Sequence, residues 1–135
     1  AMKEGKPSIV FMNTFGYLLL RQEEHPYQPL AALRLEEGAK STYQAAIVAN
    51  RALGIGTLKE MANQASSLSL LLVNPGSTSG NLVPRLGLLA AGIANPEDAF
   101  REVNYSRNHA LTLKMVAEGK ADVGAFGAEE YGKLQ

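Results

Sequence analysis

An apolar run that leads into a hydroxyl-rich loop constrains the fold of this chain more than any other feature. Residues 67–74 read "SLSLLLVN", and the second half of this run is almost wholly apolar. Such a strand is covered on both faces, as in a parallel sheet. The loop "PGSTSG" follows, and residues 81–92 then show a helical pattern that Gly92 ends. The order of strand, loop and helix predicts an α/β unit.

The same alternation continues to the end of the chain. The expected elements are, in order, a strand at 101–106, an amphipathic helix at 108–119, a strand at 121–127 and a closing helix at 128–134. Leu111, Met115 and Val116 form the expected buried face of the amphipathic helix. This pattern predicts an α/β fold of three layers, with a largely parallel sheet and helices on both faces.

The first half of the chain has a less regular pattern. Its expected elements are, in order, a strand at 7–12, a helix at 14–22, a strand at 30–35, a strand at 42–50 and a helix at 57–64. In the second half, a helical turn is also expected at 95–100. Thr14, Thr57 and Asn95 are the expected caps of the helical segments, because their side chains can accept hydrogen bonds from free backbone N–H groups.

The composition is that of an ordinary globular domain. The chain has 135 residues, of which 46% are apolar and 19% charged. Its 13 basic and 13 acidic residues balance, and without a basic run it is not expected to bind nucleic acid. Cysteine is absent, which excludes disulfides, thiolate metal sites and a cysteine nucleophile. No apolar run reaches the ~20 residues of a membrane-spanning helix, and no signal-peptide pattern is visible at the start.

Two segments share a sequence template. Residues 4–17 read "EGKPSIVFMNTFGY" and residues 118–131 read "EGKADVGAFGAEEY", with Tyr17 and Tyr131 at the same offset. Each reads as a helix end, a glycine cap, a buried strand and a helix start. Either the template is one that any α/β protein repeats, or the chain contains parts of two related lobes.

Three adjacent hydroxyl side chains, Ser77, Thr78 and Ser79, stand in the loop "NPGSTSGNLVP". The first N–H groups of a helix lack internal partners and carry about half a positive charge. A phosphate-like oxyanion can therefore accept hydrogen bonds from these groups and from the hydroxyls, and Gly80 lets it approach the backbone closely. Plain capping is the other interpretation, but a cap needs only one hydroxyl. The spacing favours an anion site.

Few other residues have readable chemistry. His109 stands at an expected helix start, where it either donates to an anion or faces solvent. Tyr43 lies in the expected strand at 42–50 as a core or edge aromatic residue. A P-loop is absent because Asn81, not lysine, follows Gly80, so nucleotide hydrolysis is disfavoured. Without a metal cluster, a cofactor motif or a convincing base beside His109, an enzyme is not expected.

The motifs of this chain resemble those of a known family. The segments "YQAAIVAN", "LLLVNPGSTSGNLVPRLGLLAAGI" and "SRNHALTLKMVAEGKADVGA" are similar to the phosphonate/phosphite/phosphate-type solute-binding proteins of bacterial ABC importers. The family motif "D-P-x-S-T-S-G-Y-x-x-P" reads "NPGSTSGNLVP" here and is quite specific. The third segment is similar to a later family motif, "G-S-H-x-x-x-x-x-x-V-x-x-G-K-x-D-x-x-A", with Arg107 and Asn108 in place of its first two residues. The likeness covers about residues 3–131.

The resemblance implies one lobe of a type II periplasmic binding protein fold, in which an oxyanion lies between two α/β lobes. Residues 1–41 are then the tail of the first lobe with the crossover, and residues 42–135 are the second, ligand-binding lobe. By the resemblance, the three loop hydroxyls hold the oxyanion and Tyr43 and His109 add hydrogen bonds. Tyr17 matches a first-lobe tyrosine near the ligand.

Three positions bear on which ligand is bound. Gly127 stands where aminophosphonate binders usually carry an acidic residue, which favours phosphate, phosphite or a phosphonate with a neutral tail. Asn81 replaces an aromatic residue after "STSG", so one wall of the pocket is expected to be more open. Arg107 either brings positive charge near His109 or points to solvent.

The expected function is that of a binding subunit, which passes a phosphorus oxyanion to the membrane subunits of an ABC importer. By the resemblance, it works in the periplasm or anchored outside the cytoplasmic membrane. The alternative is a single-lobe sensory or regulatory domain, or a fragment that binds weakly because ligands of this class lie at a domain interface. A lobe of this kind exposes the surface meant for its partner, which predicts a homodimer.

Overall fold

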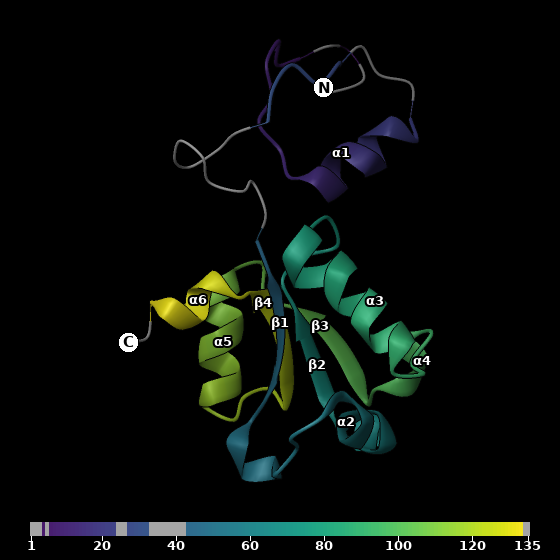
Figure 1. The fold of residues 1–135 in the computed structure, drawn as a ribbon, viewed down its shortest axis with the longest axis vertical. Coiled ribbons are helices and arrows are strands. Elements are labelled where there is room, and N and C mark those ends of the chain that lie inside the picture. Colours follow the sequence, from purple (N-terminus) through teal and green to yellow (C-terminus); the bar gives the residue numbers. More distant parts are fainter. Residues whose placement is uncertain (1–3, 5, 24–26, 33–42, 134–135) are drawn as a thin grey trace.

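The computed structural model describes residues 4, 6–23, 27–32 and 43–133 (Figure 1). Its strands are β1 (Ala45–Ala49), β2 (Ser69–Leu72), β3 (Glu102–Tyr105) and β4 (Val123–Gly127). Its α-helices are α1 (Thr14–Arg21), α2 (Leu58–Gln64), α3 (Val83–Ala90), α4 (Pro96–Ala99), α5 (His109–Ala117) and α6 (Glu129–Gly132). The short helical turns are η2 (Arg51–Leu53), η3 (Ala65–Ser67) and the π-helical η4 (Thr78–Leu82), which runs directly into α3.

Among the described residues, the strands form one four-stranded sheet in the order β1-β4-β2-β3. β2 pairs in parallel with β3 and with β4, while β1 runs antiparallel to β4 with Ala45 opposite Gly127. The carboxyl ends of β2, β3 and β4 therefore meet the start of β1 at one edge, which we call the loop edge. The predicted α/β class and largely parallel sheet are confirmed.

Helices cover both faces of the sheet, with α2 and α3 on one face and α5 on the other (Figure 1). Successive side chains of a strand point to opposite faces. Leu70 and Leu72 therefore pack under α2 and α3, while Leu71 packs under α5. Ala125 and Phe126 of β4 divide between the faces in the same way. Cover on both faces explains the apolar run at residues 70–73 and confirms the three predicted layers.

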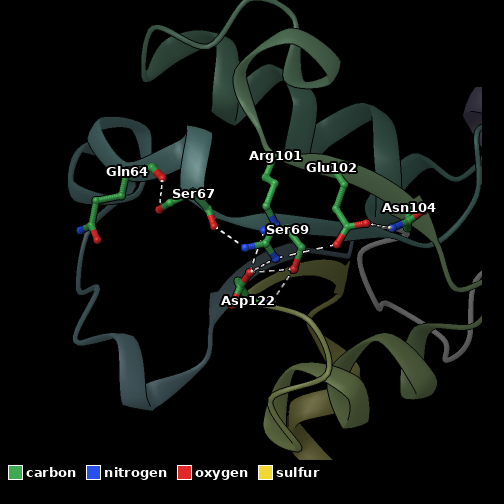
Figure 2. Close-up of polar contacts among 7 residues, drawn as sticks. All are labelled: Gln64, Ser67, Ser69, Arg101, Glu102, Asn104 and Asp122. Atoms are coloured by element: carbon green, nitrogen blue, oxygen red, sulfur yellow. Dashed lines mark hydrogen bonds and ion pairs between the residues drawn. The ribbon is translucent and has the colours of Figure 1, made fainter.

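A polar cluster, here called the Asp122 clamp, joins the strands at the opposite edge of the sheet (Figure 2). The Oδ2 atom of Asp122 accepts hydrogen bonds from the backbone N–H of Ser69 at 2.8 Å and from the Ser69 hydroxyl at 2.9 Å. Arg101 donates to the same oxygen at 3.1 Å and to the carbonyl of Ser67 at 2.7 Å. These bonds, the backbone bond from Ser69 foremost, lower the pKa of Asp122. The clamp holds the amino ends of β2, β3 and β4 together.

Thr57 is confirmed as a side-chain cap, whereas Asn95 stands at the predicted cap position without making the capping hydrogen bond. Thr57 caps α2 in a capping box with Glu60, each side chain accepting from the other residue's backbone N–H. Gly92, with a φ of +94°, follows the end of α3. Asn95 is the N-cap residue of α4, although its side chain donates to Asp98 instead of accepting from the helix.

The buried strand predicted at residues 7–12 is wrong. This segment is irregular, and Ile9 and Phe11 are 70% and 79% exposed. A strand needs a neighbour for its backbone hydrogen bonds, and in the described part of the chain none of the four strands lies beside this segment. The template shared by residues 4–17 and 118–131 therefore does not produce the same local structure, because only the second segment contains a strand, β4.

Other details of the prediction also differ. Asn13 rather than Thr14 caps α1, accepting from the backbone N–H of Gly16 at 2.7 Å. Residues 30–32 form no strand, and residues 33–35 lie outside the described residues. The helix expected from residue 81 already begins at Thr78, as η4.

The buried face of α5 does not include Leu111, which the prediction placed there. Leu111 is 42% exposed, whereas Thr112, Leu113 and Val116 are buried against the sheet. Val116 packs with Leu71 of β2, and Leu113 packs with Phe126 of β4. The prediction placed Leu111 inside because it counted apolar residues and left the buried threonine out.

Candidate functional site

The hydroxyl loop lies at the loop edge, between the end of β2 and α3. Ser77 is the N-cap of the helical run, and its Oγ accepts from the backbone N–H of Gly80 at 3.0 Å. Val73, directly after β2, donates its backbone N–H to the carbonyl of Gly80 at 3.0 Å. One of the three hydroxyls is therefore a cap, and the first turn of η4 is held against the sheet.

Gly80 is required here by space. A Cβ atom added to Gly80 would lie 2.5 Å from the Cβ of Val73 and 2.9 Å from the Oγ of Ser77. Real Cβ atoms do not approach other heavy atoms this closely, so any side chain would push the loop away from β2. The residue is fully enclosed by this packing.

The second hydroxyl of the loop contacts the N-terminal helix. The Oγ1 atom of Thr78 accepts from the backbone N–H of Phe15 at 3.0 Å and donates to the Oδ1 atom of Asn13 at 3.2 Å. Because Asn13 caps α1 and Thr78 begins η4, these bonds join the first turns of α1 and η4. The positive dipole ends of two helices therefore converge at this point.

His109 begins α5 at the same edge of the sheet. Its Nδ1 atom accepts from the backbone N–H of Gly127, the last residue of β4, at 2.9 Å. In a neutral imidazole, an accepting Nδ1 places the ring proton on Nε2, which is then free to donate. Asn108 caps α5 by accepting from the backbone N–H of Leu111 at 2.9 Å. A third helix start is thus present at the loop edge.

The two tyrosines of the predicted site lie in different parts of the chain, Tyr43 next to β1 and Tyr17 in α1. Tyr43 lies just before β1 rather than within it, and its side chain is 55% exposed. Gln44, the next residue, accepts through its carbonyl from the backbone N–H of Ala128, which follows β4. Tyr17 is half-buried in the first turns of α1, where its backbone N–H donates to the carbonyl of Asn13 at 3.1 Å.

Two charged residues stand beside these groups. A Cβ atom added to Gly127 would lie 2.7 Å from the Cδ atom of Glu129, so the Glu129 carboxylate covers the position where other residues would carry a side chain. Arg107 has a φ of +64°, and its backbone N–H donates to the carbonyl of Val73 at 2.6 Å. A left-handed φ is uncommon outside glycine and is often found at functional sites.

The sequence interpretation missed the side chains that hold the loop from behind. Asn81 is 6% exposed and donates to the carbonyl of Pro75 at 2.8 Å, so its side chain lies inside the loop. The Nε atom of Arg85 donates to Asn81 at 2.7 Å, and its two Nη atoms donate to the carboxylate of Glu97. That carboxylate raises the pKa of Arg85, and Arg85 lowers the pKa of Glu97. The only sequence signal is the i, i+4 spacing of Asn81 and Arg85.

The described residues contain no group of three or more His, Cys, Asp or Glu side chains that could hold a metal ion. None of the helices in these parts of the chain is both long and apolar enough to cross a membrane. What the loop edge offers is hydrogen-bond donors: hydroxyls, backbone N–H groups at three helix starts, and the Nε2 of His109. Donors of this kind suit an anionic group with several acceptor oxygens.

Comparison with known proteins identifies the family of this chain. Over residues 1–135 the sequence matches the family described as "ABC transporter, phosphonate, periplasmic substrate-binding protein". It is 27% identical over 129 residues to the phosphate-import protein PhnD of Mycolicibacterium smegmatis (strain ATCC 700084 / mc(2)155), an alignment that covers 91% of this chain and 39% of that protein. The chain thus spans about two fifths of the length of this relative.

Two solved structures are similar in fold. A binding protein component of an ABC phosphonate transporter from Pseudomonas aeruginosa has a TM-score of 0.61 and 33% identity, covering 68% of this chain and 30% of its own. PhnD1 from Prochlorococcus marinus (MIT 9301), solved in complex with methylphosphonate, has a TM-score of 0.57 and 25% identity, covering 67% of this chain and 34% of its own. The resemblance seen in the sequence motifs is confirmed, and the chain belongs to the family of periplasmic phosphonate-binding proteins of ABC transporters.

Proposed function

We propose that this chain binds a phosphorus oxyanion at the loop edge and serves as part of the substrate-binding component of an ABC importer. The observation that carries the proposal is the meeting of two helix starts at Thr78, beside the Ser77 cap. Backbone N–H groups and hydroxyls at such a place can stabilise a phosphate-like group without a counter-cation. Membership of the family supports the same assignment.

In this proposal, the hydroxyls of Ser77, Thr78 and Ser79 donate to the oxyanion oxygens. His109 donates from Nε2, because its Nδ1 is already occupied by the backbone N–H of Gly127. Thr78 exchanges its bonds with α1 for bonds to the ligand, so ligand entry displaces Asn13 from this hydroxyl. Tyr43 and Tyr17, as well as the division of the chain at residues 41 and 42 into parts of two lobes, stay predictions from the resemblance.

Glu129 provides a test of which oxyanion is bound. Gly127 favours phosphate, phosphite or a phosphonate with a neutral tail, yet the Glu129 carboxylate covers Gly127. An exposed ion pair contributes about 1 kcal/mol or less. If this carboxylate met a ligand ammonium group, Glu129→Gln would therefore weaken the binding of 2-aminoethylphosphonate by up to about fivefold, while the binding of ethylphosphonate would not change. We expect equal affinity for the two ligands in both the wild type and the variant, measured by calorimetry. A selective loss of the amine ligand would contradict the neutral-tail prediction.

Calorimetric titration of the 135-residue chain with phosphate, phosphite and methylphosphonate tests the proposed site. We expect saturable binding to at least one ligand, and Ser77→Ala and Ser79→Ala should each weaken it by about tenfold to hundredfold, as for a hydrogen bond to a charged group. Ser66→Ala makes the same chemical change at an exposed position and should have no effect. No heat with any ligand up to millimolar concentration, or equal binding by all variants, would refute the site.

The partners and location follow from the same proposal. The membrane subunits of an ABC transporter are the proposed acceptors of the ligand, on the periplasmic or extracytoplasmic side. The alternative, a single-lobe domain with weak binding, shares the site but predicts association through exposed apolar residues. Ile9, Phe11 and Leu30 are 70%, 79% and 86% exposed, which favours this association. Light scattering at high concentration separates the cases, and a strictly monomeric chain would count against the predicted homodimer.

A further inference from the structure

We infer that Arg85 is a positioning residue for the oxyanion site, which sets the shape of the hydroxyl loop through Asn81 without touching the ligand. The expected effect of Arg85 on oxyanion affinity rests on the proposed function. Its structural part, control of the loop by Arg85, is independent of any ligand.

The contacts form a chain from α4 to the loop. Both Nη atoms of Arg85 donate to the carboxylate of Glu97, with Nη1 at 2.9 Å, which fixes the plane of the guanidinium group. The third donor, Nε, is thereby directed at the Oδ1 atom of Asn81, at 2.7 Å. The Nδ2 atom of Asn81 in turn donates to the carbonyl of Pro75 at 2.8 Å. This link spans the loop from Pro75 to Asn81 and encloses all three hydroxyl residues.

Arg85 also connects the loop to the strand that leads to His109. Its Nη2 atom donates to the hydroxyl of Tyr105, the last residue of β3, at 3.1 Å. The chain then continues through Ser106, whose backbone N–H donates to the carbonyl of Leu72 at the end of β2. One guanidinium group thus holds both segments that supply proposed ligand donors, and displacement of either by even an ångström weakens a preorganised site.

The charge of Arg85 is already paired, which favours a role in positioning the loop over direct binding of an anion. The bidentate ion pair with Glu97 neutralises the guanidinium, and its Nε donor is used by Asn81. Asn81 is almost fully buried, so loss of its partner would leave a buried amide oxygen without a donor, at a cost that distorts the loop. Only arginine offers this fork together with a third donor, since lysine can pair with Glu97 but cannot reach both groups.

The test compares Arg85→Gln and Arg85→Lys with Arg101→Gln, a matched control that removes an arginine of the Asp122 clamp at the opposite edge. In ligand-free ¹H–¹⁵N spectra, we expect both Arg85 variants to shift the amides of residues 76–81 and to speed hydrogen exchange of the Gly80 amide. Arg101→Gln should leave these amides unchanged. Affinity for methylphosphonate and inorganic phosphate should fall roughly tenfold in the Arg85 variants and stay at the wild-type value in the control.

Each outcome decides one claim. If the loop amides of Arg85→Lys match those of the wild type, the inference is overturned, whether or not any anion binds. Arg85→Lys retains the positive charge and therefore still provides this test if Arg85→Gln does not fold. Perturbed loop amides with unchanged affinity would overturn the link to the site. If the wild type binds neither anion, the proposed function fails, while the ligand-free spectra still decide whether Arg85 shapes the loop.

Discussion

Gly80→Ala is expected to unfold the hydroxyl loop and to abolish oxyanion binding. The added methyl group would lie 2.5 Å from the Cβ of Val73, an apolar residue that is 1% exposed and cannot move without disturbing the sheet. Overpacking of this kind costs about 1–3 kcal/mol of folding free energy. Because Gly80 also donates to the Ser77 cap, the loop conformation is lost first. Urea denaturation measures the stability, and calorimetry with phosphate and methylphosphonate measures the binding.

Gly76→Ala is the matched control for this variant, since it adds the same methyl group to the same loop. A Cβ atom at Gly76 would meet only the Oδ1 atom of Asn74, at an ordinary distance of 3.6 Å. We expect its stability to lie within about 0.5 kcal/mol of the wild type. Equal stability of the two variants would show that Gly80 is not held by the packing described above.

Asp122→Ala should have the largest effect on stability outside the site. It leaves the backbone N–H of Ser69, a residue that is 7% exposed, without its acceptor and removes the nearer of the two ion-pair partners of Arg101. A buried donor left unpaired costs about 1–3 kcal/mol. Asp98→Ala, which removes an exposed carboxylate from α4, serves as the control and should cost much less. Thermal denaturation that finds the two variants equally stable would contradict the role of the clamp.

The Asp122 clamp also predicts how stability depends on pH. The hydrogen bonds from Ser69, followed by the charge of Arg101, lower the pKa of Asp122 in the folded state. The stabilisation is therefore complete above the unfolded-state pKa of about 3.9 and is lost as the pH falls through the lower, folded-state pKa. We expect the stability difference between the wild type and Asp122→Ala to be constant from pH 7 to about pH 5 and to shrink below about pH 4. A difference that does not change with pH would refute the charged clamp.

The sequence predicted those parts of the fold that depend on local pattern. The apolar run at residues 67–74 predicted a strand covered on both faces, and Thr57 predicted the start of α2, because a cap and its helix are neighbours in the chain. The strand at residues 7–12 had the same local pattern but lacks a neighbouring strand among the described residues. Strand pairing is a property of the whole fold, so composition alone could not distinguish the two cases.

In the candidate site, too, only the features that depend on local sequence could be predicted. The hydroxyl loop and the helix start at His109 were readable from residue types and spacing. The contacts of Thr78 with Asn13 and Phe15 join residues more than 60 positions apart, and no local pattern indicates them. Arg85 was missed because its partners Glu97 and Tyr105 lie 12 and 20 residues away, where only the fold brings them together.

Titration of the ¹⁵N-labelled chain with methylphosphonate, followed by amide chemical shifts, shows whether the oxyanion binds at the hydroxyl loop. We expect saturable shifts that are largest at residues 77–80 and at His109, with small shifts at the Asp122 clamp on the far edge. The side-chain Nε2 signal of His109 should move with the same midpoint. Saturable shifts centred elsewhere, or no shifts at any ligand concentration, would contradict an oxyanion site at the hydroxyl loop.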